Sequence, residues 1–361
     1  MNSSVSPIPD VHDLTLDQRL GQMLMLGFRG TRLDEDNPIV TDLRDDRIGG
    51  VILFNYDTVL NSFERNIASP DQVTRLTADL MSRAEIPLIT AVDQEGGTVN
   101  RLSPDYGFPV TKSHKDLGEI NDLALTYKYA QEIAVLLRST GHNMNFAPCV
   151  DLAINKENKA IYGRDRCFSD DPEVAALHAS AYIRAHRQAG ILTTLKHFPG
   201  HGSSKADTHF GMVDVTDTWQ EFETLPYLRI LDEGLCDTIM TTHIVNRKLD
   251  PDWPATLSTM ILTGILRGHM GFDGVIISDD LQMKAISEHY GQDAVMQRAL
   301  LAGVDILLYG NNMDFEPGVS GRFQRVAKEM LDRGEISEER INASAERILG
   351  LKKQIQGRGT V

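Results

Sequence analysis

Short runs of apolar and β-branched residues recur along the chain and alternate with longer stretches in which apolar residues return every three or four positions. The first pattern is typical of buried strands and the second of amphipathic helices. Eight such runs stand at residues 23–28, 50–54, 87–92, 144–150, 192–197, 238–243, 274–278 and 305–309. Strands that alternate with helices build a parallel sheet covered by helices, and eight of them predict a closed (β/α)₈ barrel of the TIM type.

Two of the intervening helices have start signals of their own. Ser69, followed by Pro70 and Gln72, offers an N-cap, a proline in the first turn and a glutamine three residues after the cap. A second helix is predicted to begin at residues 170–172 and to end near Gly190. Its predicted apolar stripe consists of Val174, Leu177, Ala181 and Ala185.

The last part of the chain predicts further helices rather than a second sheet domain. Two apolar stripes follow the eighth run, and we expect them to pack on the outside of the barrel. No proline- or glycine-rich linker divides the chain, so one domain is predicted over residues 1–361, with the barrel at 15–315 and the terminal helices at 316–356. The stretch 99–121 is predicted to be a loop with short elements.

Composition limits the classes of partner. Lys and Arg number 36 against 51 Asp and Glu, so the net charge of −15 argues against nucleic acid or an anionic membrane surface as a partner. No stretch is long and apolar enough to span a bilayer, and the first residues lack the features of a signal peptide. The three cysteines form no CxxC pair. These features predict a soluble protein of a reducing, cytoplasmic compartment.

Polar residues follow several of the apolar runs directly. The third run leads into 93–97 (DQEGG), the fifth ends in Lys196 and His197, the sixth ends in His243, and the seventh leads into 279–280 (DD). In a parallel barrel the carboxyl ends of the strands meet at one rim, where active sites form. Charged groups there are costly to desolvate unless they face a solvated or ligand-filled pocket. The pattern therefore predicts one shared polar site.

Each of these groups also has a structural interpretation. Asp93 and Glu95 could cap a loop beside the two glycines that follow them. His243 could be a core histidine whose hydrogen bonds are satisfied. One carboxylate of the pair Asp279 and Asp280 is expected to cap the next helix, and only the carboxylate that faces the barrel interior can take part in catalysis.

Residues 196–209 (KHFPGHGSSKADTH) form the segment richest in acid–base groups. We expect a mobile loop over the barrel mouth. There the carboxylate of Asp207 can bind one imidazole nitrogen of His209 and raise the proton affinity of the other. A solvated loop is one alternative. A metal site built from His197, His201, His209 and His243 is another, but the HxH and HExxH spacings of metal hydrolases are lacking and no metal is predicted.

The order of motifs carries a resemblance that covers nearly the whole chain. The motifs are GQMLMLGF (21–28), VDQEGG (92–97), NFAPCVD (145–151), KHFPGHG (196–202) and GVIISDDL (274–281). At these residues the sequence resembles glycoside hydrolase family 3, and within it the short β-N-acetylglucosaminidase branch. The fold that this resemblance implies is the barrel that the pattern of apolar runs predicts.

The resemblance also implies roles for individual residues. Asp279 matches the family's nucleophile, which forms a glycosyl-enzyme intermediate. His209, supported by Asp207, matches the histidine that acts as general acid and then as general base. Two displacements would retain the anomeric configuration. The positions that match the family's sugar-binding residues are Asp93, Arg101, Arg166, Lys196 and His197.

Chain length agrees with this branch. β-Glucosidase-like members add a second α/β domain that brings a glutamate as acid/base, whereas this sequence ends after the predicted terminal helices. The acid is therefore expected on the barrel's own loop. Thr98 stands where the family often has arginine, and residues 203–206 differ from the usual spacer before the Asp-Ser-His triplet, so the closing geometry of the loop and the aglycone preference are not implied.

The resulting hypothesis is a retaining exo-β-N-acetylglucosaminidase that needs no cofactor. It would release non-reducing terminal N-acetyl-β-D-glucosamine from a small carbohydrate, plausibly a cell-wall (peptidoglycan) fragment during recycling, as a monomer or homodimer without nucleic-acid or membrane partners. The alternatives are a β-glucosidase, xylosidase or glycoside phosphorylase of the same fold, a non-catalytic sugar-binding barrel, and a metal-dependent amide hydrolase.

Overall fold

The computed structural model describes residues 7–205, 207–208 and 211–358. Within them every predicted run forms a strand of one parallel sheet, in the order β11-β9-β7-β6-β3-β2-β1-β12. An isolated parallel bridge between Ile277 and Ile306 links the two end strands and completes the barrel. The predicted (β/α)₈ barrel is thus confirmed. Its strands are β1 Leu24–Gly27, β2 Gly50–Leu53, β3 Ile89–Val92, β6 Met144–Asn145, β7 Leu192–Phe198, β9 Thr238–Thr241, β11 Val275–Ile277 and β12 Leu307–Tyr309.

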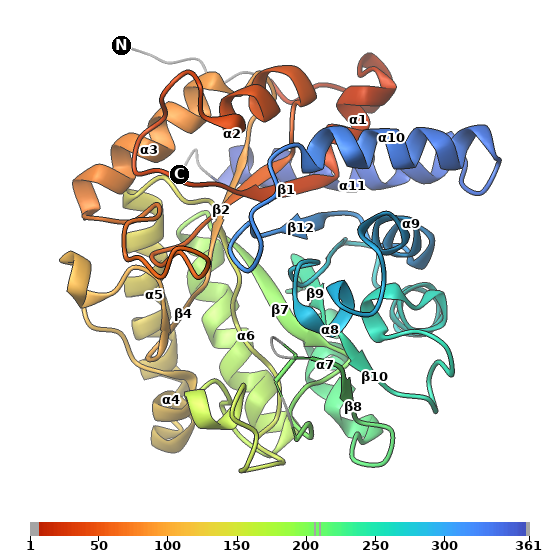
Figure 1. Cartoon of the computed structure of the whole chain (residues 1–361). Helices are drawn as coiled ribbons and strands as arrows, with labels where there is room; N and C mark the ends of the chain where they lie inside the picture. Colours follow the sequence, from red (N-terminus) through yellow and green to blue (C-terminus); the bar gives the residue numbers. More distant parts are fainter. Residues whose placement is uncertain (1–6, 206, 209–210, 359–361) are drawn as a thin grey trace.

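Helices surround the barrel (Figure 1). The predicted start of α3 is confirmed, because the Ser69 side chain accepts a hydrogen bond from the backbone N–H of Gln72. The α-helices are α1 Leu16–Gln22, α2 Pro38–Thr41, α3 Pro70–Arg83, α4 His114–Ile120, α5 Leu123–Ser139, α6 Pro172–Gln188, α7 Leu225–Asp232, α8 Lys284–Ser287, α9 Gln292–Ala302, α10 Val319–Asp332 and α11 Glu338–Arg358. Wider π-type turns form two more helical segments, Asp42–Asp46 and Met260–His269.

Two short sheets extend the barrel at its carboxyl rim. β4 (Gln94–Gly96) pairs antiparallel with β5 (Val99–Asn100) directly after β3. β8 (Val213–Asp214) pairs in parallel with β10 (Ile244–Val245), and so joins the segments that follow β7 and β9. The stretch 99–121 holds β5, a short 3₁₀ turn and α4, as predicted. These additions fix the loops from which the candidate site is built.

The predicted terminal helices are present. Both α10 and α11 contact α1, and α11 also contacts β11. Of the residues in their predicted apolar stripes, Phe323, Val326, Ile341 and Ile348 are fully buried, whereas Leu331 is only partly buried. None of the helices in the described part of the chain has the length and hydropathy that crossing a membrane requires.

The stripe predicted for α6 is wrong. Leu177 is 51% exposed and Val174 and Ala181 are only partly buried, which leaves Ala185 as the single fully buried member. The buried face is one position away and carries polar groups, since His178 lies against Thr126 (2.8 Å) and His186 against Asn145 (3.0 Å). Small residues and satisfied histidines allow α6 to pack closely on α5, a contact that apolar spacing alone does not predict.

Lys352 is an unusual member of the core. Its side chain is 1% exposed and its ammonium donates to the Gln22 side chain at 2.6 Å, and no carboxylate among the described residues pairs with it. Burial lowers the pKa of Lys352 to about 7. The unfolded chain binds this proton more tightly, so the group destabilises the fold most below pH 7, and the cost falls as the pH rises from 7 toward 10.5.

We expect Lys352→Met to raise the free energy of unfolding by about 1–3 kcal/mol at pH 6.5, because the removed charge penalty exceeds the cost of leaving Gln22 unpaired. The gain should shrink at pH 9.5. Urea denaturation at both pH values measures it, and Lys353→Met, on the exposed face of the same helix, is the matched control. A gain independent of pH would contradict a buried charge as its cause.

Candidate active site

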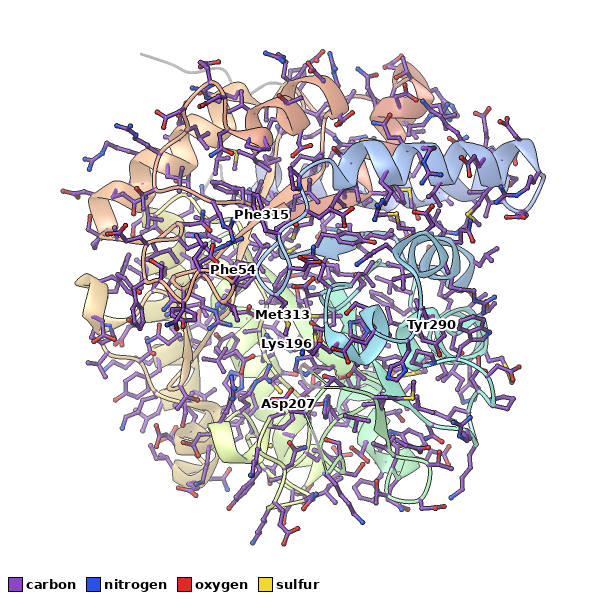
Figure 2. The ribbon with its side chains drawn as sticks, in the orientation of Figure 1. Phe54, Lys196, Asp207, Tyr290, Met313 and Phe315 are labelled. Atoms are coloured by element: carbon purple, nitrogen blue, oxygen red, sulfur yellow. The ribbon has the colours of Figure 1, made fainter. Side chains whose placement is uncertain are left out.

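A cavity of about 280 Å³ opens among the loops that follow the barrel strands. Six of the eight predicted site residues line it: Asp93, Arg101, Arg166, Lys196, His197 and Asp279. Phe54, Lys196 and Met313 belong to the same wall and lie near the middle of the barrel in Figure 2. The volume is close to the lower limit of small-molecule sites, about 300 Å³, which suits one ring-sized group rather than an oligomer.

Lys196 lies at the end of β7 and is 1% exposed. Its ammonium contacts Asp93 at 2.8 Å and Glu95 at 2.7 Å. Burial disfavours its charge, but the two carboxylates outweigh that effect and raise its pKa. The pKa of Asp93 is lowered in turn, because Lys196 and Arg101 together outweigh the burial of its carboxyl group. The Lys196 side chain therefore remains positively charged and is held in place in the wall of the cavity.

Glu95 and Arg166 form the second buried ion pair. Two guanidinium nitrogens of Arg166 donate to the Glu95 carboxylate at 2.7 and 2.9 Å, and a third donates to the Ala160 carbonyl at 3.1 Å. Burial alone would raise the pKa of Glu95, but Arg166 and Lys196 hold it well below its usual value. Glu95 therefore does not cap a loop, since it compensates two cations from β4.

His197 connects this cluster to the loop that carries Asp207 and His209. Arg166 donates to Nε2 of His197 at 3.1 Å, which fixes the proton on Nδ1, and Nδ1 donates to Asp151 at 2.7 Å. The backbone N–H of His201 donates to Asp151 at 2.8 Å. A sugar hydroxyl that reaches Nε2 of His197 would share that nitrogen with Arg166.

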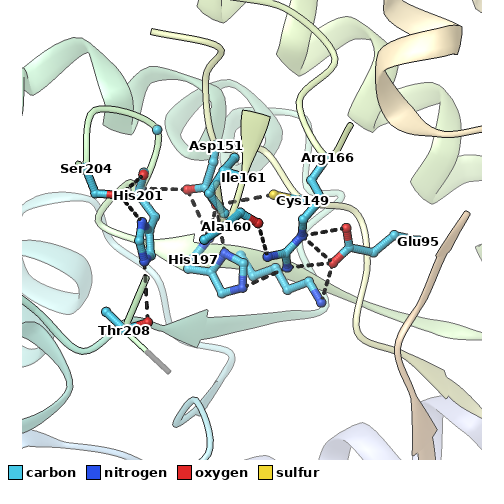
Figure 3. A network of polar contacts seen from close by, with 12 residues as sticks. Glu95, Cys149, Asp151, Ala160, Ile161, Arg166, His197, His201, Ser204 and Thr208 are labelled. Carbon is cyan, nitrogen blue, oxygen red and sulfur yellow. Dashed lines mark hydrogen bonds and ion pairs between the residues drawn. The ribbon is translucent and has the colours of Figure 1, made fainter. Parts of the chain in front are cut away.

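Asp151 is the anchor of this second cluster, which Figure 3 shows. Burial would raise its pKa, but the contacts with His197 and His201 keep it below its usual value. The other end of the cluster is His201, whose ring contacts Ser204 at 2.7 Å and Thr208 at 3.5 Å. Burial lowers the pKa of His201 to about 4, so its imidazole is neutral near pH 7.

Asp279 and Asp280 follow β11, and both line the cavity. Neither caps the next helix, contrary to the prediction, because α8 has Met283 at its N-cap and no side-chain cap hydrogen bond. The Asp280 carboxylate accepts the backbone N–H groups of Gln282 and Gly310, both at 3.1 Å, and so holds two loops together. The Asp279 carboxylate accepts the N–H of Asp280 at 2.8 Å and lines the cavity. His243 is fully buried and donates to the Asp280 carbonyl at 3.0 Å, as expected of a structural histidine.

His209 lies outside the described residues. Asp207 is partly buried and lies below Lys196 in the view of Figure 2, although it does not line the cavity. Between them, Thr208 accepts a hydrogen bond from the backbone N–H of Ala285 at 3.3 Å. Ala285 belongs to α8, which follows Asp279 in the chain, so this contact ties the two loops together.

Arg101 is held less tightly than the other cations. Its guanidinium lies 3.8 Å from the Asp93 carboxylate and 5.9 Å from the centre of the Phe54 ring. Thr98, at the position where the family often has arginine, donates its hydroxyl to the Arg164 carbonyl. The hairpin β4–β5 is thereby attached to the 3₁₀ turn Tyr162–Arg164, and Arg164 also lines the cavity.

Sequence reasoning missed the anchoring roles of Glu95 and Asp151. Both carboxylates follow barrel strands at the same rim as the buried cations, and that position was the available signal. What the sequence did not reveal is which cation each carboxylate meets. Asn55, Tyr56 and Thr58, which line the cavity from the loop after β2, carried no recognisable motif.

One group of side chains could in principle hold a metal ion. Ligand atoms of Cys149, Asp151 and His197 lie within 4.8 Å of one another. Their hydrogen bonds already use those atoms, because the thiol donates to Asp151 at 3.2 Å and the imidazole donates to the same oxygen. Burial raises the pKa of Cys149 well above its usual value, which disfavours the thiolate that a metal needs. The chemistry favours a hydrogen-bonded cluster.

The chain is similar to known proteins over most of its length. The family model for "Glycosyl hydrolase family 3 N terminal domain" matches residues 15–351. A protein named Beta-hexosaminidase from Xylella fastidiosa (strain M23) is 38% identical over 293 residues, which cover 79% of this chain and 82% of that protein. A protein of the same name from Tolumonas auensis is 36% identical over 294 residues, with 80% and 83% covered.

Solved structures show the same fold. A glycoside hydrolase family 3 β-N-acetylglucosaminidase from Paenibacillus sp. str. FPU-7 has a TM-score of 0.85 and 34% identity over 95% of this chain. This chain spans only 63% of that protein's length. A β-N-acetylhexosaminidase from Beutenbergia cavernae has a TM-score of 0.83 and 26% identity, and the match covers 94% of this chain and 99% of that one.

The buried ion pairs predict a large effect of Glu95→Gln. The change leaves Arg166 and Lys196 without a shared counter-charge, so the free energy of unfolding should fall by about 3–5 kcal/mol near pH 7. Because the folded-state pKa of Glu95 lies well below 4.5, its contribution is complete above that pH and is lost as the pH falls further. Urea denaturation measures the effect. Glu119→Gln, at an exposed site on α4, is the control, and equal losses for the two variants would refute the assignment.

Proposed function

The chain belongs to glycosyl hydrolase family 3, and on this basis we propose that it is a retaining exo-β-N-acetylglucosaminidase. The family inferred from the motifs and the class of glycoside hydrolase are confirmed by the comparisons. The observation that carries the finer proposal is the convergence of Asp279 with Asp93, Arg166 and Lys196 on one cavity the size of a single sugar ring. Such a cavity suits an enzyme that removes one terminal residue at a time.

The proposed nucleophile is Asp279. In this mechanism its carboxylate attacks the anomeric carbon of the bound sugar and the bond to the leaving-group oxygen breaks, which gives a covalent glycosyl-enzyme. Water then attacks the same carbon, and the second inversion restores the β configuration. Asp279 and Asp280 both line the cavity. Support for Asp279 comes from the family motif and from the backbone N–H groups of Gln282 and Gly310, which already bind the Asp280 carboxylate.

The proposed acid/base is His209, with Asp207 as the group that orients it. His209 would give its proton to the glycosidic oxygen in the first step and take one from water in the second. Its role comes from the family motif. The hydrogen bond between Thr208 and Ala285 supports this role, because it holds Thr208, the residue before His209 in the sequence, against the segment that follows Asp279.

The proposed sugar-binding residues are Asp93, Arg101, Arg166, Lys196 and His197. Two donors of the Lys196 ammonium meet carboxylates, and its third N–H can reach a sugar hydroxyl. The ionised Asp93 can accept from another hydroxyl. Because the cations and anions are fixed before the substrate arrives, little reorganisation is needed at the moment of reaction.

The proposed physiological substrate is a small carbohydrate with non-reducing terminal N-acetylglucosamine, as in a peptidoglycan fragment. This rests on the resemblance to the N-acetylglucosaminidase branch and on the names of the similar proteins. Rates with 4-nitrophenyl glycosides would test the donor sugar, and a preference for the glucoside or xyloside over the N-acetylglucosaminide would refute it.

Removal of the nucleophile should abolish turnover. Asp279→Ala is expected to lower kcat on 4-nitrophenyl N-acetyl-β-D-glucosaminide by about 10⁴-fold or more, because the carboxylate proposed to form the intermediate is removed. Azide should restore release of nitrophenol and give an α-glycosyl azide, since a single displacement inverts the configuration. Asp217→Ala, an exposed carboxylate, is the control. Inversion by the wild-type enzyme in an NMR time course would disprove the mechanism.

The decrease in rate caused by removing the acid should depend on the leaving group. We expect His209→Ala to slow release of a poor leaving group such as an alkoxide by about 10²–10⁴-fold and to spare glycosylation by 2,4-dinitrophenyl N-acetylglucosaminide, which needs no proton. The slope of log(kcat/KM) against leaving-group pKa measures this. His269→Ala removes an exposed histidine and serves as the comparison. Equal losses on all leaving groups would remove His209 from the acid role.

A further inference from the structure

Three large apolar side chains are exposed within five residues on the loop that follows β2. Val59 is 49% exposed, Leu60 60% and Phe63 69%, and we call these three residues the β2 ledge. Single exposed apolar residues are common on protein surfaces, as Leu177 on α6 illustrates. A cluster of three on one short loop is less usual and suggests a surface that binds something.

Several polar contacts hold this loop in one conformation, so the β2 ledge is not exposed because the loop is disordered. Asp57 accepts from Arg65 at 2.5 Å, from Arg29 at 2.7 Å and from the backbone N–H of Leu60 at 2.8 Å. Burial would raise the pKa of Asp57, but these donors lower it to about 2. Asp57 also forms an antiparallel bridge with Ser62. The fold thus fixes these apolar groups in water.

The β2 ledge is continuous with the cavity. Asn55, Tyr56 and Thr58 belong to the same loop and line the cavity wall. The Tyr56 ring lies 5.0 Å from the Phe63 ring, and the backbone N–H of Thr58 donates to Asn312, another wall residue, at 3.1 Å. Because the cavity holds only one ring, whatever is joined to that ring must lie over the rim.

We propose that the β2 ledge, together with Tyr56, is the subsite for the leaving group and that it binds a second sugar ring. This inference rests on the proposed function. A pyranose ring has apolar C–H faces and a polar edge of hydroxyls. This rim offers both kinds of partner, an aromatic pair in Tyr56 and Phe63 and amide side chains in Asn55, on the same loop, and Asn312, on the segment after β12. An alkyl chain at this position would cover the amide side chains without forming hydrogen bonds to them, which is unfavourable.

The test compares two substrates with alkoxide leaving groups, the β-1,4-linked disaccharide of N-acetylglucosamine and methyl N-acetyl-β-D-glucosaminide. The measured quantity is the ratio of their kcat/KM values. Loss of one aromatic face should lower this ratio by about five- to twenty-fold in Phe63→Ser, and Phe63→Trp should keep it near that of the wild type. Leu177→Ser, at a half-exposed apolar residue on α6, should leave the ratio unchanged.

The other outcomes each overturn the proposal in a recognisable way. An unchanged ratio in both Phe63→Ser and Leu60→Ser would show that the β2 ledge does not bind the leaving group. A larger loss with octyl N-acetylglucosaminide than with the disaccharide would assign it to an alkyl group. A dimer that dissociates in Phe63→Ser, seen by light scattering with equal losses on both substrates, would make it an interface between copies. If the wild type hydrolysed no N-acetylglucosaminide, the proposed function itself would fail.

Discussion

The buried carboxylate of Glu95 is the group on which the candidate site most depends. It is 1% exposed and lies 2.7 Å from both Arg166 and Lys196, two cations that are themselves almost removed from water. Burying either cation without a counter-charge would cost several kcal/mol. The short strand β4, which places Glu95 against both cations, is therefore what allows the protein to keep fixed positive charges in the wall of the cavity.

From Glu95 the polar contacts continue across the barrel mouth. Arg166 meets His197, His197 meets Asp151, and Asp151 in turn binds the backbone of His201 (Figure 3). The ring of His201 contacts Thr208, which in the sequence lies between Asp207 and His209, the two residues proposed for acid–base chemistry. The groups proposed to bind the sugar and the loop with the proposed acid are thus parts of one hydrogen-bonded network, which fixes tautomers and side-chain directions before a ligand arrives.

The loop after β2 shows a different use of a buried charge. Asp57 accepts hydrogen bonds from two arginines and one backbone N–H. These contacts stabilise a hairpin whose outer side chains are apolar. These charge-assisted hydrogen bonds stabilise the conformation in which the β2 ledge is exposed to water, although exposure of its apolar side chains is unfavourable. The cavity is therefore lined by fixed ion pairs inside the barrel, whereas the loop at its rim carries apolar side chains that face outward.

The sequence by itself determined the barrel, because eight apolar runs separated by amphipathic segments can bury their faces in few other ways. It also determined that Asp93, Lys196, His197 and Asp279 share a rim, since the carboxyl ends of parallel strands meet there. Only the tertiary structure decided that Glu95 pairs with Arg166, 71 residues away, and that the Asp280 carboxylate binds the distant backbone N–H of Gly310. The buried face of α6 was decided in the same way. Strand and helix formation follows local periodicity, whereas the partner of a buried polar group depends on which distant segments the packed fold brings together.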